Sequence, residues 1–119
     1  MAPRDRAKSP ADLLAHEFAQ EKASALGRLG RALEAALAAL ARFDAERPDG
    51  VPSAEQRPVR AALVAEASVA LWHFAVQREA SGLRDMRHVL RDYRVPAEVA
   101  AGMGALPQPS GPGHAWRKA

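Results

Sequence analysis

The feature that most constrains this chain is a long stretch without a helix breaker. After Pro10 no proline occurs until Pro48. At the start of the stretch Ser9 can cap a helix, Pro10 suits the first helical position, and Asp12 favours the positive end of the helix dipole. These signals predict one helix of about 35 residues, about 53 Å long at 1.5 Å per residue.

The second half of this helix carries an apolar stripe that needs a partner helix. The stripe, called the leucine stripe below, recurs at steps of three or four residues and consists of Leu26, Leu29, Leu33, Leu37, Leu40 and Phe43. A Pro- and Gly-containing loop at residues 48–52 precedes a Ser53–Gln56 capping signal. The partner helix is therefore expected from near Arg57 to Ser81, with Gly82 ending it. We expect an antiparallel hairpin in which position numbers across the contact sum to about 103.

The second helix is apolar on two nearly opposite sides. One side faces the leucine stripe, and the other, called the second-helix stripe, consists of Ala65, Val69, Trp72 and Val76. A helix that is apolar on both sides lies between two partners. A second copy of the chain is one candidate for the second partner, and the C-terminal helices are the other.

Two short helices are expected after the hairpin. One spans Leu83 to Tyr93, and the next starts at Pro96 and is ended within two turns by Gly102 and Gly104. Because the second helix is shorter than the first, the third should cover residues 10–20 and bring Phe18 near Met86. The predicted fold class is all-α, a long antiparallel helical hairpin plus two short C-terminal helices, with a dimeric bundle as its expected assembly.

Composition and charge support a single helical domain. Cys, Ile, Thr and Asn are absent and Ala occupies 28 of 119 positions, which excludes a disulfide scaffold and disfavours strands. Residues 9–104 form the predicted domain, with 12 basic and 13 acidic residues. The positive excess lies in residues 1–8 and in the Pro- and Gly-rich residues 105–119, both expected to be disordered. No export signal or run of 18 apolar residues occurs, so we expect a cytoplasmic protein that does not insert into membranes.

Two blocks of the sequence carry a family resemblance. They are EKASALGRLG at 21–30 and VQREASGLRD at 76–85, followed by YRVPAEV at 93–99. Together they resemble a family of short uncharacterised α-helical bacterial proteins, a domain of unknown function. The resemblance spans most of residues 13–104 and implies no activity, so it assigns no catalytic residue.

The sequence offers few arrangements that carry chemistry. Asp85, His88 and Asp92 have the spacing of ligands on one helix face, but without the paired Glu-x-x-His motifs of metal-binding bundles they indicate solvated charge. None of the serines lies in a nucleophile elbow, and no Gly-rich phosphate loop occurs. We therefore predict no catalytic, cofactor-binding or metal-binding residues, no identifiable small-molecule ligand, and no enzymatic activity.

A stripe of arginines supplies the alternative function. It lies beside the apolar face of the third predicted helix and consists of Arg84, Arg87, Arg91 and Arg94. With the basic ends it could contact nucleic acid. Interleaved aspartates and the neutral predicted domain favour a solvated or internally paired stripe.

Polar residues interrupt the hairpin contact near its open end. Lys22 lies close to the centre of the leucine stripe and faces Ser81 in the predicted register. Because an unpaired buried charge is costly, we expect a polar layer that fixes the register; the alternatives are an anion held by Lys22 and Arg78, or simple exposure of Lys22. Its members are Glu21, Lys22, Gln77, Arg78, Glu79 and Ser81.

The function favoured by the sequence is a small non-enzymatic helical interaction module that forms a homodimer through its second helix. The alternative is a nucleic-acid-associated regulator that uses the stripe of arginines and the basic ends of the chain.

Overall fold

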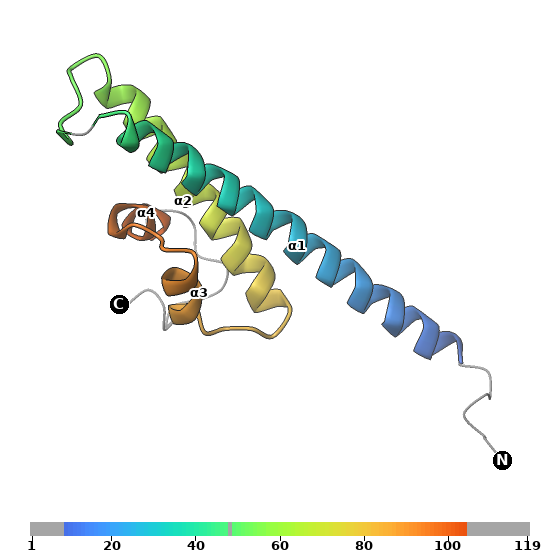
Figure 1. Cartoon of the computed structure of the whole chain (residues 1–119). Coiled ribbons are helices and arrows are strands. Elements are labelled where there is room, and N and C mark those ends of the chain that lie inside the picture. Colours follow the sequence, from blue (N-terminus) through green and yellow to red (C-terminus); the bar gives the residue numbers. More distant parts are fainter. Residues whose placement is uncertain (1–8, 48, 105–119) are drawn as a thin grey trace.

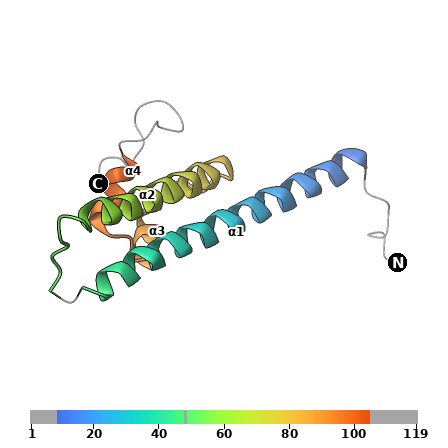
Figure 2. The same ribbon diagram turned by 90° about the horizontal axis from the view of Figure 1, so that it is seen from above.

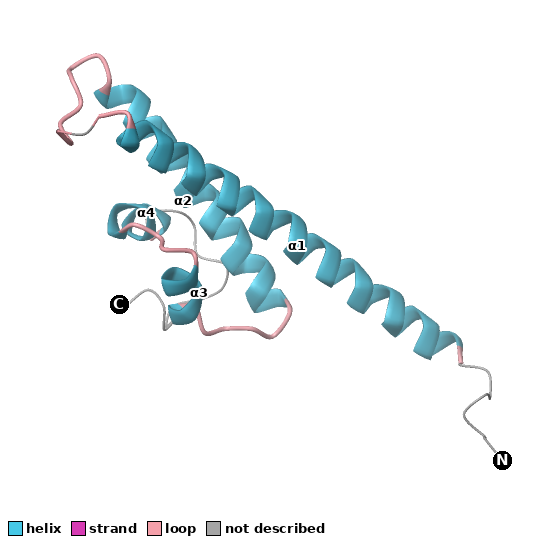
Figure 3. Ribbon diagram, viewed as in Figure 1, coloured by secondary structure: helices cyan, strands magenta, loops and turns pink. Residues whose placement is uncertain are grey.

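The chain folds as a helical hairpin with two short helices against one side (Figure 1). The structure is a computed structural model and describes residues 9–47 and 49–104. Its helices are α1 (Pro10–Ala45), α2 (Arg57–Ala80), α3 (Arg87–Asp92) and α4 (Ala97–Met103). No strand occurs among the described residues (Figure 3). The predicted fold class is confirmed, whereas the predicted ends, 1–8 and 105–119, lie outside the described residues.

Local signals fix where the two long helices begin. The Ser9 hydroxyl accepts the Asp12 amide at 3.1 Å, and the Ser9 amide donates to the Asp12 carboxylate at 3.4 Å. This reciprocal capping box satisfies amides that the first turn leaves without helical partners. The same exchange joins Ser53 and Gln56 just before α2, at 2.7 and 3.2 Å. Both predicted helix starts are confirmed.

Two contacts across the hairpin define its register. A Cβ added to Gly30 would lie 3.4 Å from the Phe74 ring, and Arg60 pairs with Asp44. In both pairs the position numbers sum to 104, against the 103 predicted. Gly30 also lies under the Tyr93 hydroxyl, 3.2 Å from the same Cβ position. The missing side chain therefore allows the close approach of α2 and of the residue that follows α3.

The core forms where α1, α2 and α4 meet. Its fully buried large side chains are Leu33, Leu40, Leu71 and Val99. The Ser68 hydroxyl in α2 donates to the carbonyl of Val99 in α4 at 2.9 Å. α2 thus contacts α1 with one side and α4 with another. By length and composition alone α2 could also cross a membrane, a test that the core helix of a soluble protein also passes.

The first half of α1 extends beyond the hairpin. In the observed register Ala80, the last residue of α2, is level with residue 24, and Figures 1 and 2 show α1 continuing alone from there. We call residues 10–23 the overhang; each of them is exposed. Leu14 and Phe18 are 50% and 59% exposed.

The prediction that the third helix covers residues 10–20 is wrong. Phe18 is exposed, whereas Met86 is 2% exposed and belongs to the core around α2. The chain reverses at Gly82, which has a φ of 85°, and the Asp85 carboxylate accepts the Arg87 amide at 3.0 Å. This local turn competes with helix at residues 83–86, so α3 is shorter than the predicted helix at 83–93.

Candidate functional site

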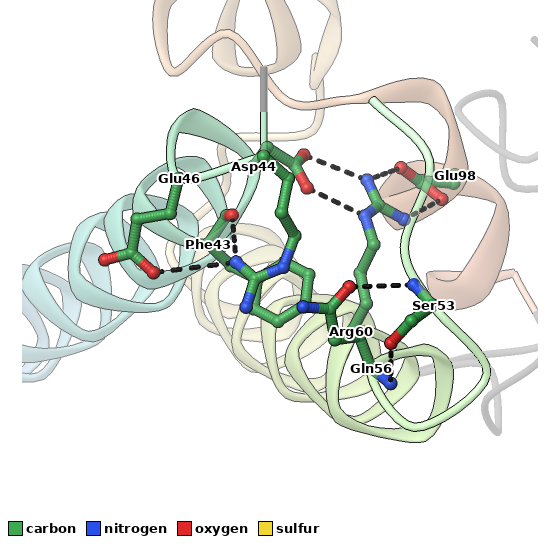
Figure 4. A network of polar contacts seen from close by, with 8 residues as sticks. Phe43, Asp44, Glu46, Ser53, Gln56, Arg60 and Glu98 are labelled. Atoms are coloured by element: carbon green, nitrogen blue, oxygen red, sulfur yellow. Dashed lines mark hydrogen bonds and ion pairs between the residues drawn. The ribbon is translucent and has the colours of Figure 1, made fainter. Parts of the chain in front are cut away.

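The strongest polar cluster is an arginine clamp that joins three helices (Figure 4). Arg60 of α2 binds the Asp44 carboxylate through Nε at 2.9 Å and through one terminal nitrogen at 3.0 Å. It also binds the two oxygens of Glu98 in α4, at 3.0 and 2.6 Å. The planar guanidinium thus makes a bidentate contact with each carboxylate.

The electrostatics of the clamp indicate a structural role. Hydrogen bonds from Arg60 lower the pKa of both Asp44 and Glu98. Hydrogen bonds to Glu98 and then Asp44 raise the pKa of Arg60 further above its usual value. All three groups are held in their charged forms, so none is poised to exchange a proton near neutral pH. The clamp ties the closed end of the hairpin to α4.

Sequence reasoning did not identify this clamp. A signal for its first half was available, because Asp44 and Arg60 carry opposite charges and their position numbers match the hairpin register. Its second half depends on where α4 docks, which no local pattern in the sequence specifies.

The predicted polar layer does not form within one chain. Glu21 and Lys22 are exposed, and no hydrogen bond or ion pair between described residues joins Lys22 to residues 77–81. The reason is the register: with a sum of 104, Lys22 is level with residue 82, beyond the end of α2. The remaining predicted members, Gln77, Arg78, Glu79 and Ser81, are partly or fully buried near the end of α2.

Within that group Arg78 faces the C-terminal segment instead of α1. It is 9% exposed and donates to the Asp85 carbonyl at 3.1 Å. Its other neighbour is His88 Nε2 at 3.4 Å, and its Nε is buried without a hydrogen-bond partner. Arg78 therefore anchors the turn before α3 on α2.

The second-helix stripe is only partly covered. Ala65 is exposed and Val69 is 39% exposed, while Trp72 and Val76 are partly buried. The Trp72 indole nitrogen is buried without a hydrogen-bond partner, so the exposed part of this side chain is its apolar carbon surface. α4 contacts the neighbouring face of α2 at Ser68. The described C-terminal helices leave part of the stripe open.

The arginine stripe is exposed and partly neutralised by its neighbours. Arg87 pairs with Asp85 at 3.2 Å and Arg91 with Asp92 at 3.6 Å. The hydrogen bond from Arg87 lowers the pKa of Asp85 to about 2. Arg84 and Arg94 are exposed at the two ends of the stripe.

The same contacts separate Asp85, His88 and Asp92, the row that the sequence analysis interpreted as solvated charge. Asp85 lies outside α3, and both aspartates of the row pair with arginines, while His88 faces Arg78. In the described part of the chain no three His, Asp or Glu side chains are grouped as metal ligands.

Comparison with known proteins adds a family. A family model described as "Family of unknown function (DUF6665)" matches residues 4–111. No curated protein and no solved structure matches the chain.

Proposed function

The chain belongs to DUF6665, a family of unknown function, and from this premise we propose that it is a small non-enzymatic helical interaction module that associates with a second copy of itself. The family assigns no activity, so the proposal depends on the surfaces that the fold leaves uncovered.

The observation that carries the proposal is the exposed overhang. Leu14 and Phe18 are four residues apart, and Leu26 of the leucine stripe follows Phe18 after two more steps of four residues. Each step of four turns a further 40° around the helix, so Phe18 lies near the edge of the leucine stripe and Leu14 lies just beyond that edge. Burying one such side chain stabilises a structure by about 1.5–3 kcal/mol. A partner helix over the overhang would recover this free energy.

The open part of the second-helix stripe supports the same proposal. Val69 and the apolar edge of Trp72 form a patch on the side of α2 that its own α1 does not cover. Contiguous exposed apolar surface on a small protein is typical of interaction sites. A symmetric dimer that uses the second helix would cover it.

The arginine clamp supports a non-enzymatic role. Its three charged side chains satisfy one another and hold the helices together. A catalytic arginine or carboxylate would need bonding capacity left for a substrate.

The test is the mass of the full chain in solution. Sedimentation velocity over a range of concentrations should give twice the 12.7 kDa chain mass at high concentration. Val69→Asp and Trp72→Asp should shift the protein to monomer, while Ala35→Asp, at an exposed helical position on α1, should leave the dimer intact. A monomer at all concentrations would contradict the proposal.

Nucleic-acid binding is the second candidate, because Arg84, Arg87, Arg91 and Arg94 are all exposed on one segment. Phosphate binding weakens steeply between low and physiological salt, whereas apolar self-association does not. Titration of labelled DNA and RNA at two salt concentrations separates the two. The pairing of two of these arginines with aspartates favours self-association.

A further inference from the structure

The second-helix stripe has the spacing of the core positions of a coiled coil. Its members, Ala65, Val69, Trp72 and Val76, follow one another at steps of four, three and four residues. Alternating steps of three and four are the heptad repeat with which two helices pack along their length. The stripe can therefore pack on a helix of the same spacing, and the α2 of a second copy is such a helix.

The neighbours of the stripe leave space for this helix. At 100° per residue, the centre of the stripe points about 170° away from Phe74, which lies against Gly30 of α1. Ser68, which bonds to Val99 of α4, lies on one edge of the stripe, about 70° from its centre. α1 thus covers the opposite face of α2, and α4 covers one edge of the stripe.

The other edge, called the open edge, carries one acid and one histidine. Glu66 and His73 are exposed and lie about 90° and 70° from the centre of the stripe, on the side away from Ser68. They are seven residues apart, about 10 Å along the helix axis, so they take equivalent places on the edge without reaching each other. In the described part of the chain neither makes a hydrogen bond or an ion pair.

We propose that two copies of α2 pack antiparallel through the second-helix stripe, and that Glu66 of each copy binds His73 of the other. The two-fold axis passes between the levels of Val69 and Trp72. The inference rests on the proposed self-association and adds the orientation, the register and the polar pair that selects them. Each α2 then lies between its own α1 and the second α2.

The open edge selects among the registers that the heptad repeat allows. In an antiparallel coiled coil, core layers join the two alternating core positions, so Val69 lies level with either Ala65 or Trp72 of the second copy. In the first register the position numbers across the contact sum to 134. Glu66 then faces Glu66 of the second copy, and the two carboxylates repel each other.

In the second register the position numbers sum to 141. Ala65 is then level with Val76 of the second copy, so a small residue faces a larger one. On the open edge Glu66 faces His73 of the second copy, and the symmetry repeats this pair. A neutral imidazole and an imidazolium both carry an N–H, so His73 can donate to a carboxylate in either form. The edge therefore favours the second register.

The position of α4 favours the antiparallel orientation. In a parallel coiled coil the open edge of one helix would face the opposite edge of the other, which α4 covers at Ser68. Glu66 and His73 would then not meet. In the antiparallel pair the two open edges face each other, and both α4 helices lie on the other side of the contact.

Engineered disulfides test the register, because the natural chain contains no cysteine. Ala65→Cys mixed with Val76→Cys should give a covalent heterodimer under mild oxidation, visible on a non-reducing gel. Each variant alone should remain unlinked, because two copies of position 65 lie about 11 residues, or about 16 Å, apart along the axis. Ala35→Cys, at an exposed position on α1, should link to neither. Linkage of Ala65→Cys alone or of Glu66→Cys alone would contradict the register.

A charge-reversal series tests the polar pair. His73→Glu places a carboxylate beside Glu66 of the second copy at two places and should raise the dimer Kd about tenfold. Adding Glu66→Arg restores opposite charges and should return the Kd to within about threefold of wild type. Adding Glu34→Arg instead makes the same charge change at an exposed position on α1 and should not restore it. Equal effects of the two added changes would contradict the pair.

The outcomes separate the inference from the proposed function. A wild-type dimer in which Ala65→Cys and Val76→Cys do not link would leave the self-association standing and overturn the antiparallel register. A wild-type monomer at all concentrations would overturn the proposed function itself, and the inference with it.

Discussion

Gly102→Ala should destabilise the fold through one contact, between α4 and Ser68 of α2. A Cβ at position 102 would clash with the Ser68 hydroxyl and lie 3.2 Å from the Ser68 Cβ. The hydroxyl cannot move freely, because it donates a buried hydrogen bond to the Val99 carbonyl at 2.9 Å. The substitution must either displace α4 or rotate the hydroxyl away from Val99.

The magnitude follows from three contributions. Overpacking costs about 1–3 kcal/mol, and loss of the hydrogen bond costs about 0.5–1.5 kcal/mol where the hydroxyl rotates. Replacing glycine by alanine within a helix returns about 1 kcal/mol. We expect a net loss of about 1–3 kcal/mol in the free energy of unfolding.

A double-mutant cycle isolates the contact. In a Ser68→Ala background only the 3.2 Å approach to Cβ remains, so Gly102→Ala should be close to neutral there. The coupling free energy should therefore be about 1–3 kcal/mol, measured by urea unfolding with far-ultraviolet circular dichroism at one protein concentration. Stabilisation by Gly102→Ala, or an equal cost in both backgrounds, would refute the reasoning.

Four further predictions concern the clamp, its pH dependence, the core and Lys22. Arg60→Lys keeps the charge but loses both bidentate contacts, so it should lower the free energy of unfolding by about 1 kcal/mol in thermal or urea unfolding. Arg57→Lys, a control at an exposed position, should leave it nearly unchanged. Arg60 lowers the pKa of Asp44 and Glu98, so the clamp's contribution to the free energy of unfolding should be complete above about pH 5. It should be lost as the pH falls through the lowered folded-state pKa values. If the stability of Arg60→Gln changed with pH in the same way as that of the wild type, this reasoning would be contradicted. Leu33→Ala, at a fully buried position, should lower the free energy of unfolding by about 2–5 kcal/mol. Leu37→Ala, at a partly buried position, should lower it clearly less in the same assay. Because Lys22 is exposed, Lys22→Leu should leave the helix content unchanged and the free energy of unfolding within about 0.5 kcal/mol of wild type; a clearly larger loss would mean that Lys22 has a structural partner.

Local signals in the sequence predicted the hairpin well. The Ser9 and Ser53 capping boxes set the helix starts, and the leucine stripe set the face of α1 that packs. The register came within one residue because Phe43 and the loop length leave little freedom at the closed end of the hairpin. These features depend on residues close together in the chain.

The features that sequence reasoning missed depend on residues far apart. Arg60 binds Glu98 across 38 positions, and no spacing rule connects them. The third helix was placed over residues 10–20 because the second helix is shorter than the first. The Asp85 carboxylate instead accepts the Arg87 amide and forms a turn, and the segment that follows packs on α2. Lys22 was placed opposite Ser81 because the predicted position numbers sum to about 103; with the observed sum of 104, Lys22 is level with residue 82, beyond the end of α2.

The most direct test of the proposed self-association is a distance measured between two copies. A spin label on Ala35→Cys lies on the exposed side of α1, away from the leucine stripe. Pulsed electron resonance at high protein concentration should give one defined distance between chains, and Trp72→Asp should abolish the dipolar signal. The absence of any dipolar signal in the wild-type sequence background, or a signal that Trp72→Asp leaves unchanged, would contradict self-association through the second-helix stripe.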